Sequence, residues 1–168
     1  MSAMPTCSSP NKPNWFQGID DVLQKSGSSF DEAFDELSVW RSITGSYDDG
    51  DHFKNGGKYQ AVAIAATHSL DELPIQGNLE SREYGSRHIA FTPDSFSGGL
   101  KVSVAGDPEV GWGGALLSWK GDAPVQVTQL AYAGEHGTAS IESLDGVTRL
   151  VLVVTQKNPV YSVLALIA

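Results

Sequence analysis

The chain has 168 residues, 40% of them hydrophobic, and its 20 acidic against 11 basic side chains give a formal net charge of −9. This length fits one domain, or one domain with a helical extension. The acidic balance argues against a nucleic-acid partner and against docking on anionic lipid, and no apolar run approaches the ~20 residues of a membrane-spanning helix.

Residues 1–14 are rich in Ser, Pro and Asn, which predicts a disordered tail. The lone cysteine, Cys7, has no second cysteine with which to form an internal disulfide or a metal site. Because residues 1–6 contain no apolar segment, we expect no signal peptide here. The chain would then be cytoplasmic or a piece of a longer exported precursor.

Two helices, joined by a Gly-Ser turn, are predicted to form an αα-hairpin over residues 15–45. The first, 15–25, has apolar side chains at helical spacing. The second, 29–44, begins with a capping box of Ser29 and Glu32 and is expected to stop at Gly45. Its polar side chains Asp35, Glu36 and Arg41 should face water, while an apolar stripe packs on the domain. That stripe consists of Phe30, Ala33, Phe34, Leu37, Trp40 and Ile43.

Residues 46–58 form a polar, Gly-rich linker between the helical and β parts. It contains the densest carboxylate cluster of the chain, Asp48, Asp49 and Asp51. Carboxylate oxygens on a Gly-containing loop are ligands that Ca²⁺ uses, although the EF-hand pattern is absent. Two interpretations stay open, a calcium site and a solvated turn in which the aspartates cap backbone N–H groups.

From residue 59 the hydrophobic pattern changes to the alternation of β-strands. A loop is predicted over 68–79, and Asp145-Gly146 predicts a tight hairpin turn. Turn signals separating about seven to nine short strands predict a mainly β domain over 59–168. We expect an antiparallel β-sandwich of the immunoglobulin, fibronectin or jelly-roll kind. The strands before that turn are predicted at 59–67, 86–92, 100–105, 112–120, 125–133 and 137–143.

The last part of the chain, 147–168, is the stretch around which the sandwich is predicted to be built. The runs 148–155 and 161–167 are rich in Val, Leu and Ile, and an Asn-Pro turn signal in 156–160 divides them. They are predicted to pair as an antiparallel hairpin. Both faces of the first run are apolar, so the hairpin should lie in the middle of the sandwich. One face would carry Val151, Val153 and Thr155, and the other Leu150, Leu152 and Val154.

No catalytic motif is present: the sequence has no HExxH, no GxSxG and no P-loop. The histidines are far apart in the sequence, so an enzyme would need His68, His88 or His136 to meet a carboxylate or hydroxyl in a cleft. The motifs therefore favour a protein that is not an enzyme, with a convergent site as the alternative.

Aromatic side chains are the best candidates for ligand binding. Trp112 and Trp119 lie on one predicted strand at an odd spacing, which puts them on opposite faces. An exposed tryptophan, together with Tyr132, predicts a platform on which a sugar ring can stack. The alternative is that all three are packing residues.

The order of these segments resembles the C-terminal region of secreted bacterial metalloprotease-like proteins of the myxobacterial type. The resemblance rests on SSFDEAFDELSVWRSITGSYDDGDHF and YGSRHIAF, and it covers residues 15–167. It implies a helix that closes a catalytic domain, followed by a β-sandwich that ends in a hairpin. The family's zinc-binding helix has no counterpart in this chain, so the resemblance implies no zinc ligand here. The matching residues are Phe30, Phe34, Trp40, Thr44, Gly45, Tyr84, Gly85, Leu150 to Val154 and Tyr161.

These observations predict a non-catalytic β-sandwich module with an accessory, binding or assembly role. A carbohydrate-binding module and a structural subunit of a surface assembly are the alternatives, the latter through unpaired strand edges. The partner would be a protein or a polysaccharide, and no cofactor is expected apart from the alternative of Ca²⁺. The resemblance implies an extracellular or cell-surface location, and the oligomeric state stays open.

Overall fold

The structure, a computed structural model, describes residues 14–79, 84–93, 96, 98–107, 110–157 and 163–167. The chain divides into two units, Met1–Phe34 and Asp35–Ala168, each of which is described by itself. The predicted tail with Cys7, the Asn158-Pro159 turn and Tyr161 lie outside the described residues. Within the described part, no helix is long and apolar enough to span a membrane.

The first unit contains helix α1 (Asn14–Lys25) and the start of helix α2 (Phe30–Arg41). One half of the predicted capping box is present: the Ser29 hydroxyl accepts a hydrogen bond from the Glu32 backbone N–H at 3.1 Å. The Asp20 carboxylate accepts the backbone N–H of Phe30 at 2.7 Å. The rings of Phe16 and Phe30 meet edge to face with centroids 4.7 Å apart. These contacts connect α1 to the start of α2, and the two predicted N-terminal helices are present.

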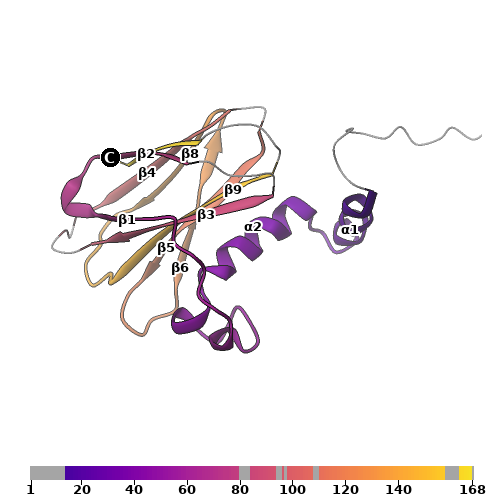
Figure 1. Cartoon of the computed structure of the whole chain (residues 1–168), viewed down its shortest axis with the longest axis horizontal. Coiled ribbons are helices and arrows are strands. Elements are labelled where there is room, and N and C mark those ends of the chain that lie inside the picture. Colours follow the sequence, from indigo (N-terminus) through magenta and orange to yellow (C-terminus); the bar gives the residue numbers. More distant parts are fainter. Residues whose placement is uncertain are drawn as a thin grey trace, which may run out of the picture. The chain divides into compact units, whose positions relative to one another are not determined.

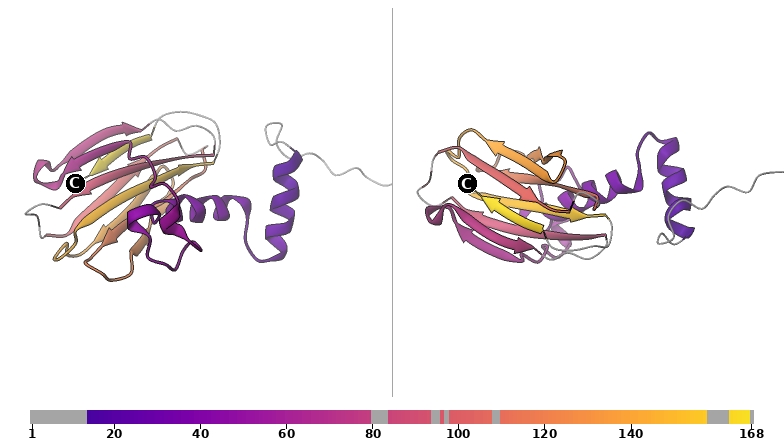
Figure 2. Two further views of the ribbon diagram at one scale, coloured as in Figure 1. Left: turned by 60° about the horizontal axis from the view of Figure 1, so that its bottom comes forward. Right: turned by 90° about the horizontal axis from the view of Figure 1, so that it is seen from above.

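The second unit is a β-sandwich of two five-stranded sheets, which confirms the predicted fold class. Figure 2 shows the sheets as two layers. Sheet A has the order β1-β3-β9-β5-β6 and sheet B the order β2-β10-β4-β8-β7. All pairs are antiparallel except β1 with β3, which is parallel. Sheet A comprises β1 (Ala66–Ser69), β3 (Gly85–Thr92), β5 (Trp112–Trp119), β6 (Gln126–Gln129) and β9 (Arg149–Gln156). Sheet B comprises β2 (Ile75–Leu79), β4 (Leu100–Ala105), β7 (Ala131–Ala133), β8 (His136–Ile141) and β10 (Val163–Ile167).

Strand β9 lies at the centre of sheet A, between β3 and β5 (Figure 1). Both of its faces are covered, and Leu150 to Val154 are at most 1% exposed. One face, with Leu150, Leu152 and Val154, belongs to the main core between the sheets. The other, with Val151 and Val153, packs against Val39 and Ile43 at the end of α2 and beyond it. The predicted two-faced burial of this strand is therefore confirmed.

The predicted pairing of the last two strands is wrong. β9 pairs with β3 and β5 in sheet A, whereas β10 pairs with β2 and β4 in sheet B. The Asp145-Gly146 turn likewise connects β8 of one sheet to β9 of the other and is no hairpin turn. A turn signal in the sequence does not specify whether the strands on either side of it pair with each other. Because a β-sandwich buries apolar side chains between two layers, successive strands can join opposite sheets.

Three other boundaries differ from the prediction. Of the strand expected at 59–67, only the last residues are in a strand, β1. The loop expected over 68–79 contains the strand β2. The strand expected at 125–133 is two strands, β6 in sheet A and β7 in sheet B, because the chain changes sheets at Leu130. Leu130, at the change of sheet, is buried in the core between the sheets.

The buried side of α2 also differs from the predicted stripe. Leu37 is 48% exposed, while Ser38 and Val39 are buried. Asp35, expected to face water, is only 23% exposed and contacts Thr155 and Lys157. Helix α2 is thus rotated from the orientation that its hydrophobic residues alone predict, and polar contacts of Asp35 accompany this rotation.

Candidate functional site

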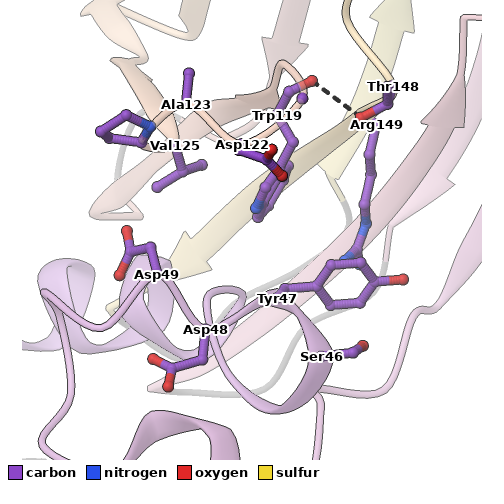
Figure 3. A pocket seen from close by; sticks show the side chains of 12 residues that line it. Ser46, Tyr47, Asp48, Asp49, Trp119, Asp122, Ala123, Val125, Thr148 and Arg149 are labelled. Carbon is purple, nitrogen blue, oxygen red and sulfur yellow. Dashed lines mark hydrogen bonds between the residues drawn. The ribbon is translucent and has the colours of Figure 1, made fainter.

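A pocket of about 480 Å³ opens beside the end of β5 in the second unit. Its size lies within the range of roughly 300–1,000 Å³ typical of small-molecule sites. One side is formed by residues 46–49, the turn that follows α2, and the other by residues 121–125, the connection from β5 to β6. Trp119, Thr148 and Arg149 complete it (Figure 3). We call this cavity the Arg149 pocket.

The central feature of the Arg149 pocket is a guanidinium held against two aromatic rings. Trp119 and Arg149 are directly opposite each other in the β5–β9 register, so their side chains project on the same face of sheet A. The guanidinium carbon of Arg149 lies 3.2 Å from the ring centroid of Tyr47 and 4.9 Å from that of Trp119. These are cation–π distances, which hold the arginine side chain along the pocket wall.

Arg149 is half-buried and forms no ion pair with any described residue. Burial lowers the pKa of its guanidinium, while the neighbouring Tyr47 hydroxyl acts in the opposite direction. Two buried donors here, the Nη1 of Arg149 and the Nε1 of Trp119, have no hydrogen-bond partner within the described part of the chain. A buried donor without an acceptor costs roughly 1–3 kcal/mol, so a ligand oxygen that reaches these groups recovers this energy.

The pocket also carries three carboxylates, those of Asp48, Asp49 and Asp122. Figure 3 shows Asp48 and Asp49 on the side of the turn after α2, with Asp122 on the opposite side, next to Trp119. Asp122 is exposed. With Arg149 as the one basic side chain of the lining, the pocket carries more negative than positive charge.

Backbone N–H groups fix the first two carboxylates. Asp48 accepts hydrogen bonds from the backbone N–H of Gly50 at 3.2 Å and of Gly57 at 2.6 Å. Gly56 is required here, because a Cβ at this position would overlap the Asp48 carboxylate. The turn that presents Tyr47 to Arg149 is therefore held in place by its neighbour Asp48.

Asp49 contacts the imidazole of His52, with 2.8 Å between Oδ2 and Nδ1. Burial works to raise the pKa of the Asp49 carboxyl, but hydrogen bonds from the His52 side chain and the Asp51 backbone N–H outweigh it. The pKa of Asp49 consequently lies below its ordinary value, and the group is a carboxylate at neutral pH.

The structure separates the three aromatic residues proposed as a platform. Trp112 is buried between the sheets, and its Nε1 donates to the backbone oxygen of Asp107 at 3.0 Å. Tyr132 packs against the same cluster, and its hydroxyl donates to the backbone oxygen of Gly113 at 3.3 Å. Trp119 belongs to the cluster on the other face of sheet A and reaches the pocket. Of the three, Trp119 is the residue in a position to meet a ligand.

The three aspartates proposed as calcium ligands lie in the turn after α2. Two of them, Asp48 and Asp49, line the Arg149 pocket, and Asp51 does not. In the described ranges no group of three His, Cys, Asp or Glu side chains is close enough together to hold a metal ion.

Of the three histidines considered for a convergent site, His88 has hydroxyl neighbours. Its Nδ1 lies 2.8 Å from the Ser42 hydroxyl and its Nε2 lies 3.1 Å from that of Ser86. His88 is 3% exposed, so this cluster is inside the protein and does not line the Arg149 pocket. His68 stacks on the ring of Phe91, with centroids 6.0 Å apart.

Sequence patterns gave no indication of Asp122 as a pocket residue, nor of the two residues at the centre of the pocket, Tyr47 and Arg149. Both stand in segments interpreted for other reasons, Tyr47 as part of a linker and Arg149 as the start of a core strand. An arginine at the edge of an apolar run was the available signal, because a charge there needs either solvent or a partner.

No protein-family model matches the chain, and no curated protein matches it. Among solved structures, it is similar to the pre-peptidase C-terminal domain of a collagenase from Bacillus anthracis. The similarity has a TM-score of 0.46 and 13% sequence identity, and it covers 65% of this chain and 100% of the other. At these values it does not establish a shared family or activity, and the resemblance to myxobacterial metalloprotease-like proteins stays a prediction.

Proposed function

We propose that this protein is a non-catalytic β-sandwich module that acts by binding a partner at the Arg149 pocket. The observation that carries the proposal is a cavity of ligand size lined by two residues, Arg149 and Trp119, that each have a buried donor without a partner among the described residues, Nη1 and Nε1. A rigid scaffold supports them, since both residues stand on paired strands of sheet A. Convergent polar groups in an otherwise well-formed cavity are the usual signature of a binding site.

The carboxylate of Asp49 is not suited to act as a general acid. Asp48 is engaged by two backbone N–H groups, and the lowered pKa of Asp49 keeps it ionised at neutral pH. A general acid needs the opposite, a pKa raised toward neutrality.

An accessory role at the outside of the cell, beside a secreted protein, follows from the resemblance in the sequence and is part of this proposal. The partner would be a polysaccharide or a protein. Trp119 favours the polysaccharide, because an indole beside polar groups is suited to a sugar ring.

Co-sedimentation tests the proposal. The wild-type protein is mixed with insoluble cellulose, chitin, xylan and gelatin, and the bound fraction is compared with those of Trp119→Ala and Arg149→Gln. We expect binding to at least one of these materials and its loss in both variants. Glu135→Gln, which changes an exposed carboxylate in sheet B's β7–β8 turn, serves as the control and should bind like wild type.

A parallel assay addresses catalysis directly. Casein and model esters are incubated with the protein, with and without Zn²⁺. Turnover that a chelator abolishes would defeat the non-catalytic part of the proposal, and binding that none of the pocket variants alters would defeat the site.

A further inference from the structure

We propose that the Arg149 pocket is specific for a neutral sugar residue, one that carries hydroxyl groups and no carboxylate or amine. This inference rests on the proposed function and names its ligand class. It follows from the arrangement of hydrogen-bond donors, hydrogen-bond acceptors and apolar surface in the pocket.

The donors require a ligand that offers oxygen atoms. Arg149 Nη1 and Trp119 Nε1 lie on neighbouring strands and both lack an acceptor among the described residues. A ligand made only of amines or ammonium groups leaves both donors unpaired and places positive charge near the guanidinium of Arg149. The aromatic faces that would attract a cation are already in contact with that guanidinium.

The acceptors require a ligand that also donates. Asp48, Asp49 and Asp122 line the pocket, with Asp122 next to Trp119 and the other two on the opposite side (Figure 3). Asp48 and Asp49 also accept hydrogen bonds from nearby backbone N–H groups, and Asp122 is exposed. A carboxylate ligand would accept hydrogen bonds from Arg149 and Trp119. It would also bring a fourth negative charge into a pocket that already has three carboxylates and one guanidinium. Like charges within a Debye length, about 8–10 Å at moderate salt, repel one another appreciably.

A sugar hydroxyl satisfies both requirements, because its oxygen accepts hydrogen bonds while its hydrogen is donated. The remaining wall fits the apolar C–H face of a sugar ring. It consists of the side chains of Ala123, Pro124 and Val125, next to the rings of Tyr47 and Trp119. The two donors are buried beside the pocket, so binding requires the side chains of Arg149 and of Tyr47, which is 36% exposed, to move.

Calorimetric titration with matched oligosaccharides tests this inference. The neutral set is cellohexaose, xylohexaose, laminarihexaose and chitohexaose. The acidic set contains hexagalacturonate and cellohexaose whose C6 hydroxymethyl groups are oxidised to carboxylates. We expect at least one neutral hexasaccharide to bind, and the acidic ligands to bind at least about tenfold more weakly, equivalent to ~1.4 kcal/mol. Raising NaCl from about 0.05 to 0.5 M should change the affinity for the neutral sugar less than about twofold, since no ligand charge is screened.

Three variants assign the effect to the pocket. Trp119→Phe keeps a ring and removes the Nε1 donor, and we expect a loss of affinity of roughly tenfold. Asp122→Asn should strengthen the binding of the uronate relative to that of the neutral sugar. Lys101→Gln, an exposed position on β4 in the other sheet, is the control and should leave both affinities unchanged. Circular dichroism and melting temperature establish that each variant is folded.

The outcomes separate this inference from the proposed function. The neutral-sugar specificity would be overturned if the uronates bound as tightly as the neutral sugars or more tightly. It would also be overturned if zwitterionic free amino acids bound and sugars did not. Failure of every oligosaccharide to bind, while Trp119→Ala still abolishes co-sedimentation with gelatin, would overturn it too and leave the binding module standing. If the pocket variants kept both oligosaccharide binding and co-sedimentation, the neutral-sugar specificity and the proposed binding site would both be overturned.

Discussion

The carboxylate of Asp35 on α2 lies 2.6 Å from the Nζ of Lys157, just after β9, and also accepts a hydrogen bond from the hydroxyl of Thr155. Thr155 is 0% exposed. The contact therefore links the middle of α2 to the central strand of sheet A through a buried polar group, beside the apolar contacts of Val39 and Ile43.

Removing the Asp35 carboxylate should destabilise the sandwich. We expect Asp35→Ala to lower the free energy of unfolding by about 2 kcal/mol, because it leaves the buried Thr155 hydroxyl without its acceptor. Lys157→Met, which removes only a partly exposed ion pair, should cost less than about 1 kcal/mol. Urea denaturation measures both, and equal losses in the two variants would contradict this interpretation.

The absence of a side chain at Gly113 on β5 makes room for the same carboxylate. A Cβ at this position would overlap Asp35, so we expect Gly113→Ala to lower the free energy of unfolding by about 1–3 kcal/mol. In the Asp35→Ala background the cost should shrink, because the overlapping group is gone. A double-mutant cycle by urea denaturation measures this coupling, and strictly additive losses would show that Gly113 is needed for another reason.

His88 should make the stability depend on pH. Burial lowers its pKa from 6.5 to about 4, with Arg41 and Arg149 acting in the same direction. As the pH falls below about 6.5, the unfolded chain binds a proton at this residue while the folded chain does not, so stability falls until the pH nears 4. Between pH 7 and 4.5, we expect wild type to lose roughly 2–3 kcal/mol more than His88→Gln.

Denaturant titrations at several pH values test that expectation. His136→Gln, at an exposed position on β8, is the matched control and should follow the wild-type pH profile. If His88→Gln shows the same slope as wild type, the imidazole of His88 is not held neutral by the fold.

Asp48 should control the order of the turn that presents Tyr47. We expect Asp48→Ala to leave the backbone N–H groups of Gly50 and Gly57 without their acceptor. Amide exchange across residues 45–58 should then rise by about tenfold, which corresponds to a decrease of ~1.4 kcal/mol in the free energy of local opening. Asp48→Asn, which retains one acceptor oxygen, should have a smaller effect. Hydrogen-exchange mass spectrometry measures both, and unchanged exchange in Asp48→Ala would contradict the role.

The same variants test the calcium alternative. If Asp48, Asp49 and Asp51 hold Ca²⁺, added CaCl₂ should raise the wild-type melting temperature and have no effect on Asp48→Ala. An equal rise in Asp48→Ala would count against a site at these aspartates.

The sequence predicted those features that depend on local patterns. An uninterrupted apolar run predicted that Leu150 to Val154 are covered on both faces, and they are. The alternation in 100–105 predicted β4, with Leu100, Val102 and Val104 buried. Each of these predictions needs only the two-residue period of a strand and the tendency of apolar side chains to leave water.

The features that depend on contacts between distant segments could not be predicted. No local pattern in the sequence indicates that β10 joins sheet B while β9 joins sheet A. A charged residue such as Asp35 is expected to face water. Its partial burial becomes favourable through its contacts with Thr155 and Lys157, which lie far along the chain. The Arg149 pocket likewise requires Tyr47, Trp119 and Arg149 to meet from three separate segments.

The positions of β9 and β10 in the two sheets have a consequence for biosynthesis. β9 separates β3 from β5 in sheet A, and β10 separates β2 from β4 in sheet B. During translation neither layer can close before residues 149–167 leave the ribosome, so nascent chains halted upstream of residue 149 would expose unpaired strand edges and depend on chaperones.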